Sequence, residues 1–268
     1  MLSIIIIAKN EEKKIKTCLE SVKWADEIIV LDNGSQDKTK EIAGQFTDKI
    51  FTFKDLDFSS LRNKGMEKAG EDWVLYVDSD ERILEPLKEE IINIIKSDKY
   101  SAVAIPRINI ILGQRVDYPA FHPDWVIRLL KKSNFESWVG KVHEYPKFQG
   151  ELGYTKSSLI HLTHRNVDQI VLKSLDWSKI DAKLRFNSKH PKMSGWRFIR
   201  IFFTELINQG VKRGGFFGGT VGVIDSILQT FSMFITYVRL WEMQQEKDLD
   251  EVYDDIDKKL IENDFKYP

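Results

Sequence analysis

The 268 residues, 42% of them hydrophobic, suffice for one large α/β domain or for such a domain with a helical appendage. The 40 lysines and arginines nearly balance the 41 aspartates and glutamates, so the overall charge gives no preference for nucleic acid. The single cysteine, Cys18, excludes an intrachain disulfide and favours a cytoplasmic location. The most apolar stretch, residues 218–241, is interrupted by Asp225 and Gln229 and falls short of an uninterrupted membrane span. We therefore expect a protein that is soluble or lies on a membrane surface.

The first eighty residues alternate between apolar segments and segments of helical pattern. Strands are predicted at residues 2–8, 27–31, 49–53 and 73–77, and helices at residues 11–22, 37–46 and 59–69. Strands that are apolar throughout and separated by helices indicate a parallel sheet covered on both faces.

After Asp80 the pattern changes. A helix is predicted at residues 86–97, and strands or hairpins at residues 102–106, 109–118, 125–130 and 138–142. Further helices are predicted at residues 167–186, 196–208 and 220–244, followed by an acidic final helix. We interpret the chain as an α/β domain over residues 1–165 and a helical C-terminal extension over residues 166–268.

Three polar clusters follow predicted strands, at residues 9–11, 32–35 and 78–80. Because open parallel sheets bind ligands at the carboxyl ends of their strands, we expect the three clusters to converge. No G-x-G-x-x-G sequence follows the first strand, and no G-x-x-x-x-G-K-[ST] sequence is present. The sequence therefore argues against a dinucleotide site and against a phosphate loop.

Asp78 and Asp80 are the strongest chemical signal. Residues two apart project to the same side of an extended strand. Two such carboxylates suit Mg²⁺ or Mn²⁺, which bind carboxylates together with substrate phosphates. The alternative is that Asp80 caps the helix that begins near Glu85.

Asp32 and the pair Asn10 and Glu11 each allow two interpretations. Asp32 can accept hydrogen bonds from a ribose hydroxyl or a base, or it can close an Asx-turn within residues 32–35. Asn10 can contact a ligand or cap the following helix, in which Glu11 would occupy the first turn.

Four motifs, in order along the chain, carry a resemblance to a known family. They are Ser-Ile-Ile-Ile-Ile-Ala-Lys-Asn-Glu at 3–11, Ile-Val-Leu-Asp-Asn-Gly-Ser-Gln-Asp-Lys-Thr at 29–39, Arg-Asn-Lys-Gly at 62–65 and Leu-Tyr-Val-Asp-Ser-Asp-Glu at 75–81. Over residues 1–165 the chain resembles family 2 glycosyltransferases with the GT-A fold. Residues 138–144 are also similar to a segment of the bacterial subgroup that includes lipopolysaccharide-core glucosyltransferases.

The resemblance implies a GT-A α/β domain with a mostly parallel sheet flanked by helices. It implies metal-dependent, inverting transfer of a sugar from a nucleotide-diphosphate donor, a UDP-sugar in the subgroup, to a saccharide or lipid-linked acceptor in cell-envelope glycan synthesis. Mg²⁺ or Mn²⁺ would be the cofactor. The residues implied around the donor are Ala8, Asn10, Glu11 and Asp32 at the nucleotide, Arg62 and Lys64 at the phosphates, Asp78 at the ribose or diphosphate, and Asp80 at the metal. For Arg62 and Lys64 the alternative is a solvated position on a helix.

The acceptor hydroxyl requires a base, and Glu144 is the candidate ahead of Asp124. The chain lacks the Glu-Asp pair found in many relatives, and an exposed acid at a strand end is the alternative for Glu144. By analogy with related enzymes, His161 is expected to contribute a late metal or phosphate ligand, ahead of His164. A structural histidine is the alternative for both. His143 is expected only to orient its neighbours.

Apolar stripes at helical spacing run through residues 196–207 and 224–241. They predict a packed core or a seam between copies of the chain, or else a membrane platform, since residues 183–224 contain eight basic residues and one acid, Glu205. The protein is expected in the cytoplasm or on the inner face of the cytoplasmic membrane. Two rival functions stay open: a nucleotidyltransferase, and a non-catalytic binding protein of the same fold.

Overall fold

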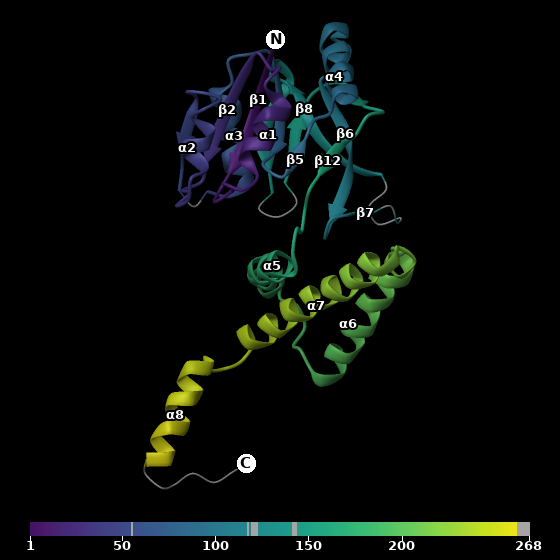
Figure 1. Ribbon diagram of the computed structural model, residues 1–268. Coiled ribbons are helices and arrows are strands. Elements are labelled where there is room, and N and C mark those ends of the chain that lie inside the picture. The colour runs from purple at the N-terminus through teal and green to yellow at the C-terminus, as the bar shows by residue number, and fades with distance from the viewer. Residues whose placement is uncertain (55, 117, 119–122, 141–143, 262–268) are drawn as a thin grey trace. The chain divides into compact units, whose positions relative to one another are not determined.

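The computed structural model describes residues 1–54, 56–116, 118, 123–140 and 144–261. Contacts between Cα atoms divide the chain into two compact units, Met1–Arg165 and Asn166–Pro268. The first unit is built around a sheet, and the second is helical (Figure 1).

Four strands make the parallel half of the sheet, as the alternating pattern predicts. In spatial order they are β3 (Ile50–Thr52), β2 (Glu27–Asp32), β1 (Leu2–Ala8) and β4 (Trp73–Asp78). Every neighbouring pair in this set is parallel, so the carboxyl ends of β1, β2 and β4 lie at one edge of the sheet. The connections reverse direction between β1 and β4, and in open α/β sheets ligands bind at such a point.

The other half of the sheet is mixed. Antiparallel β8 (Asp124–Lys131) joins β4 to β6 (Ala102–Ile111), and β12 (Leu159–His161) lies between β6 and β5 (Glu81–Arg82). The strands β7 (Gln114–Val116) and β11 (Leu152–Tyr154) also pair with β6. The short helix η2 (Lys132–Asn134) leads into β9 (Phe135–Val139), which forms a separate ribbon with β10 (Tyr145–Phe148).

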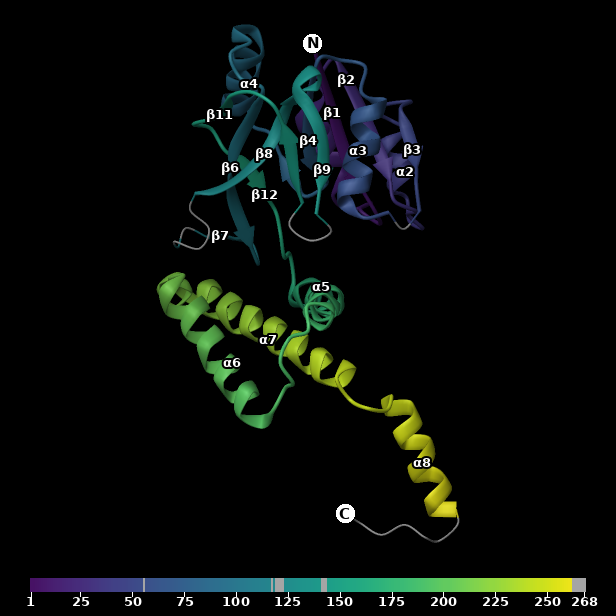
Figure 2. The same ribbon diagram turned by 180° about the vertical axis from the view of Figure 1, so that it is seen from behind.

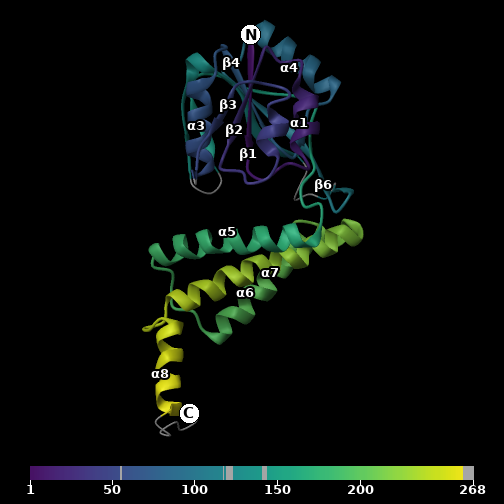
Figure 3. The same ribbon diagram turned by 60° about the vertical axis from the view of Figure 1, so that its left-hand side comes forward.

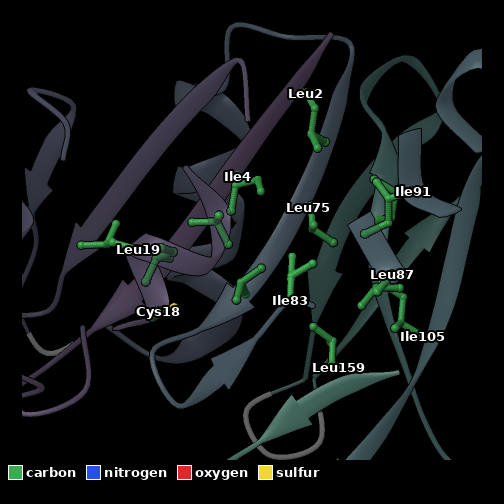
Figure 4. Packing of buried hydrophobic residues seen from close by; sticks show 14 of the residues in the cluster. Leu2, Ile4, Cys18, Leu19, Leu75, Ile83, Leu87, Ile91, Ile105 and Leu159 are labelled. Atoms are coloured by element: carbon green, nitrogen blue, oxygen red, sulfur yellow. The ribbon is translucent and has the colours of Figure 1, made fainter. Parts of the chain in front are cut away.

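Helices cover both faces of the sheet (Figure 3). Alternate residues of β1 point to opposite faces: Ile4 and Ile6 pack with α1 (Ile15–Val22), α2 (Thr39–Ala43) and α4 (Glu85–Ser97), and Ile5 and Ile7 pack with α3 (Phe58–Lys68). Figure 4 shows the first of these clusters, which includes Leu19 of α1, Leu75 of β4 and Leu87 of α4.

Two predicted helices are wrong in their bounds. The helix predicted at residues 11–22 begins only at Ile15, and the one predicted at residues 37–46 is reduced to Thr39–Ala43. The reason is tertiary, because the backbone N–H of Glu11 donates to the hydroxyl of Thr39 at 2.8 Å. Residues near both helix starts thus bind each other rather than extend the helices.

The helical unit contains α5 (Val167–Asn187), α6 (Gly195–Ile207), α7 (Gly219–Met243) and α8 (Leu249–Ile261). Two short segments, η3 (Asn208–Lys212) and η4 (Gly215–Phe217), connect α6 to α7. The helix α7 packs against both α5 and α6 (Figure 2). The helices occur where the apolar stripes predict them, within one or two residues.

Candidate active site

The loop after β1 is fixed by hydrogen bonds to the loop after β2. Asn10 has a positive φ of 56°, its N–H donates to Ser35 Oγ at 2.9 Å, and its Oδ1 accepts from the N–H of Gln36 at 2.8 Å. The helix α1 begins after Lys14 without a side-chain cap. The interpretation of Asn10 as a helix cap is therefore wrong, and its side chain joins two strand-end loops.

Asp32 is fully buried at the end of β2. Its carboxylate accepts from the N–H groups of Gly34 at 3.2 Å and Ser35 at 3.1 Å, which is the turn geometry that the sequence allows. Ala8 is the register partner of Asp32 on β1, and Glu11 forms an ion pair with Lys14 at 2.8 Å. Ala8, Glu11 and Asp32 therefore lie at the same edge of the sheet.

Asp78, the last residue of β4, is held by two arginines. Arg62 Nη2 lies 3.1 Å from Asp78 Oδ1, and Arg128 Nη2 contacts Asp78 Oδ2. Arg128 also binds the fully buried Glu81 at 2.9 Å. Burial would raise the pKa of Asp78, but the positive charges of Arg128, Arg62 and Arg107 outweigh it and hold that pKa well below its usual range.

Arg62 connects Asp78 to the candidate base. Its Nη1 lies 3.0 Å from Glu144 Oε1, and its guanidinium lies 4.7 Å from the ring centroid of Trp138. The hydroxyl of Tyr76 donates to the Arg62 carbonyl at 2.7 Å and helps to place this turn of α3. Burial and the nearby Arg128 lower the pKa of Arg62, against the opposing effect of Asp78 and Glu144.

Lys64 does not join this cluster. Its ammonium pairs with Glu67 at 2.9 Å, one turn along α3, and both side chains are about half exposed. The solvated-helix interpretation therefore fits Lys64, whereas the buried Arg62 belongs to the site.

Asp80 lies opposite His161, with 3.5 Å between Asp80 Oδ2 and His161 Nε2. The other ring nitrogen, Nδ1, lies 2.6 Å from Asn109 Oδ1. The N-cap of α4 is Leu84, so the interpretation of Asp80 as its cap is wrong. The structure thus brings together Asp80 and His161, which are 81 residues apart in the chain.

Asp124 binds Arg107 and Asn109. Its Oδ2 accepts from Arg107 Nη2 at 2.8 Å and from Asn109 Nδ2 at 3.0 Å. His164 has a positive φ of 50°, and its carbonyl accepts from the N–H of Leu112 at 3.0 Å. His143 lies outside the described residues.

Comparison with known proteins decides the family of this site. Residues 3–229 match the family described as Glycosyl transferase family 2. The chain belongs to this family. An uncharacterised glycosyltransferase of Rickettsia typhi is 28% identical over 256 residues, which cover 90% of this chain and 87% of that protein. The lipopolysaccharide core biosynthesis glycosyltransferase LpsC of Rhizobium meliloti is 23% identical over 253 residues, which cover 90% of this chain and 92% of that protein.

A crystal structure of S. aureus TarS 1-349 in complex with UDP-GlcNAc covers 87% of this glycosyltransferase and 80% of that chain, with 14% identity and a TM-score of 0.48. The family match confirms the resemblance that the four motifs carry. The fold prediction is also confirmed, because the chain has the GT-A arrangement of a mostly parallel sheet flanked by helices, followed by a helical C-terminal part.

The side chains around Asp80 fit a divalent cation. Asn109 Nδ2 donates to Asp124, so Asn109 Oδ1 faces His161 and places the ring proton on Nδ1. In the neutral ring, Nε2 then presents its lone pair toward Asp80, so the two groups could bind the same cation. Protonation of Nε2 is the other way to satisfy this pair.

Asp78 is less suited to the predicted metal role, because each of its oxygens already binds an arginine. Among the described residues, no three His, Cys, Asp or Glu side chains form a group that could hold a metal. Asp80 and His161 alone would leave the remaining positions of a cation to substrate and water oxygens, as is usual for Mg²⁺.

The prediction missed four side chains of this cluster: Glu81, Arg107, Asn109 and Arg128. One signal was available for Arg128, a charged residue inside the apolar segment Val126–Leu130. A charge in a buried strand is costly unless it is paired, so it marks a place where acids converge.

Proposed function

We propose that this glycosyltransferase moves a sugar from a nucleoside-diphosphate donor, with UDP as the nucleotide, to an acceptor hydroxyl in cell-envelope glycan synthesis. The observation that carries the proposal is the meeting of Asp78, Asp80, Arg62, Glu144 and His161 beside β4. Two side chains that could bind a cation, a carboxylate that could act as a base and a positive charge that could face a diphosphate occur together here.

The loops after β1 and β2 form the nucleotide end of the proposed site. Ala8, Asn10 and Glu11 come from the first loop, and Asp32 from the end of β2. The carboxylate of Asp32 accepts hydrogen bonds from its own turn. Asp32 would therefore act on the nucleotide indirectly, by fixing the conformation of this loop. Asn10 contributes in the same way, by tying the first loop to the second.

Asp80 and His161 would hold Mg²⁺ or Mn²⁺ together with diphosphate oxygens. Such a cation neutralises negative charge that develops on a departing diphosphate. Asn109 keeps the His161 ring in the orientation that this role requires. Arg62 and Arg128 keep the neighbouring Asp78 ionised. The negative charge of Asp78 in turn holds the two guanidinium groups in position.

Glu144 is the proposed base. The acceptor oxygen would attack the anomeric carbon while the bond to the diphosphate oxygen breaks, and Glu144 would take the hydroxyl proton. The ion pair with Arg62 places Glu144 beside Asp78. Asp124 lies beyond Arg107 in this cluster, and its Oδ2 already accepts from two nitrogens of Arg107 and from Asn109.

The acceptor class rests on relatives. The similarity to a lipopolysaccharide core biosynthesis glycosyltransferase spans 90% of this chain and supports a saccharide or lipid-linked acceptor in the cell envelope. A nucleotidyltransferase would instead release pyrophosphate, and a binding protein would release nothing, so the products discriminate the three functions.

The test is a panel of nucleotide sugars incubated with the full chain and Mn²⁺ or Mg²⁺, with release of nucleoside diphosphate as the readout. We expect one UDP-sugar to be consumed.

With an acceptor present, Glu144→Gln should lower transfer by about 10²–10⁴-fold and leave donor affinity unchanged, because an amide cannot take the proton. Asp124→Asn is the matched control and should retain most activity. If Asp124→Asn shows the loss and Glu144→Gln does not, Asp124 is the base; if no sugar nucleotide is consumed, the proposed reaction is wrong.

A further inference from the structure

The helical unit buries few of its apolar side chains. Its buried apolar residues, among those described, are Ile170, Ala182, Met193, Val221 and Leu240. Many large apolar residues on α6, η4 and α7 are exposed, and seven of them are here called the α6–α7 surface: Trp196, Ile199, Phe203, Ile207, Phe217, Ile227 and Phe231. Exposed apolar side chains in this number indicate a site of interaction.

The α6 part of this surface is a regular stripe. Trp196, Ile199, Phe203 and Ile207 are spaced by three, four and four residues, so they share one face of the helix. Each is more than half exposed. The α6 side chain Phe198 packs instead on α7, where its ring lies 5.6 Å from that of Phe234. The helix therefore uses one face for packing and leaves a second apolar face uncovered.

Between residues 225 and 231, α7 buries polar side chains and exposes apolar ones, the reverse of a helix in a water-soluble bundle. Asp225, Ser226 and Thr230 are buried, while Ile227 and Phe231 are exposed. The buried hydroxyls are satisfied within the helix, since Thr230 Oγ1 donates to the Ser226 carbonyl at 2.8 Å. Small and polar side chains inside with apolar ones outside are typical of helices whose outer face contacts lipid. Among the described helices, α7 is also long and apolar enough to cross a membrane, although core helices of soluble proteins meet the same criterion.

Positive charge adjoins the same surface. Arg197 and Arg200 lie between the residues of the α6 stripe, and the exposed Lys212 and Arg213 precede η4. A symmetric contact between two copies through this surface would bring these cations together. Anionic lipid headgroups would instead neutralise them while the aromatic side chains enter the apolar boundary.

We propose that the α6–α7 surface docks on an anionic lipid bilayer, with α6 and the exposed face of α7 lying in the headgroup region. Both helices leave large apolar side chains exposed, which suits a helical hairpin lying in the interface. This inference does not depend on the donor chemistry proposed above.

Sedimentation of the full chain with vesicles tests the docking. Vesicles of phosphatidylglycerol and phosphatidylcholine should retain the protein, more at low salt than at high salt, and vesicles of phosphatidylcholine alone should retain less. The double variant Ile199→Ser with Phe203→Ser should lose binding at both salt concentrations. Lys212→Glu with Arg213→Glu should lower partitioning by on the order of tenfold at low salt and reduce its salt dependence.

Tyr253→Ser is the matched control, because it removes a 66% exposed aromatic side chain from the acidic helix α8. It should sediment like the wild type. Absence of vesicle binding at low salt overturns the proposal, and so does binding that both double variants retain. Light scattering supplies the competing outcome: a dimer that Ile199→Ser with Phe203→Ser dissociates, without lipid binding, assigns the surface to a seam between copies. Donor hydrolysis should stay at the wild-type rate in every variant, so a failure of docking is distinguishable from a failure of the proposed reaction.

Discussion

At the residue scale, Arg128 is a buried cation that holds two acids in place. It binds Glu81 at 2.9 Å and contacts Asp78; Asp78 ends β4, and Glu81 begins β5 three residues later. Removal of one partner from a buried ion pair leaves an uncompensated charge, which costs more than the pair itself contributes. Arg128 is therefore expected to matter for stability as well as for the position of Asp78.

We predict that Arg128→Met lowers the free energy of unfolding by about 3–5 kcal/mol at neutral pH. Urea unfolding measures this loss. Lys131→Met, on the same strand, removes only the partly exposed pair with Asp98 and should cost about 0–1 kcal/mol. Equal small losses in the two variants would show that the buried pair does not stabilise the fold.

The loss in Arg128→Met should depend on pH. In the wild type the pKa of Asp78 lies below its unfolded value of about 3.9, so its contribution to stability is present above that pH and is lost as the pH falls below it. The difference between wild type and variant should therefore be full near pH 7 and shrink below about pH 4. A difference that is constant down to pH 3 contradicts the electrostatic account.

Only part of this network could be predicted from the sequence. Asp78, Asp80 and Glu144 were expected from motifs, because each stands within or beside a recognisable segment. Their partners were not, because the contact of Arg128 with Asp78 joins residues 50 positions apart through the antiparallel pairing of β8 with β4. Residue pattern along one strand does not specify which strand lies beside it.

At the element scale, the close approach of α3 to the sheet places Arg62. A Cβ added at Gly65 would lie 2.9 Å from Ile5 Cγ2 and 3.0 Å from Leu31 Cδ1. The glycine of the Arg-Asn-Lys-Gly motif thus lets the helix rest directly on β1 and β2. Any side chain there would push α3, and Arg62 with it, away from Asp78.

We predict that Gly65→Ala destabilises the protein by about 1–3 kcal/mol, because the well-packed sheet has no room for the methyl group. Thermal and urea unfolding provide the measurement, and donor affinity should fall as well. Gly195→Ala is the control, since an added Cβ there meets nothing within 4 Å. If the two alanine variants are equally stable, the close-contact explanation fails.

The strands of the parallel half and the long helices could be predicted from composition and periodicity, whereas the bounds of the short helices α1 and α2 could not. The apolar runs of β1, β2 and β4 are buried on both faces, so composition alone identifies them. The start of α1 depends instead on hydrogen bonds to a loop 25–28 residues away. Local propensity cannot anticipate such contacts, and they override it here.

At the scale of the whole molecule, the two units distribute apolar side chains in opposite ways. Unit Met1–Arg165 encloses two apolar clusters on the faces of its sheet, while unit Asn166–Pro268 has the small cluster of Ala182, Met193 and Leu240. The sequence predicted the stripes of the helical unit but could not decide between burial and exposure. Whether a side chain is buried depends on which elements pack against it, and the structure shows that many residues of both stripes are exposed.

In the proposed reaction, Asp80 and His161 would hold a divalent cation for the nucleotide-sugar donor. The most direct measurement is turnover of the donor identified by the panel, in the presence of Mn²⁺ or of EDTA. It is made for the wild type and for Asp80→Asn. Lys64→Ala, on the exposed side of α3, is the control. We predict that EDTA and Asp80→Asn each lower turnover by about 100-fold or more without loss of thermal stability, and that Lys64→Ala stays near the wild type. Wild-type turnover by both Asp80→Asn and the EDTA-treated enzyme would contradict the claim.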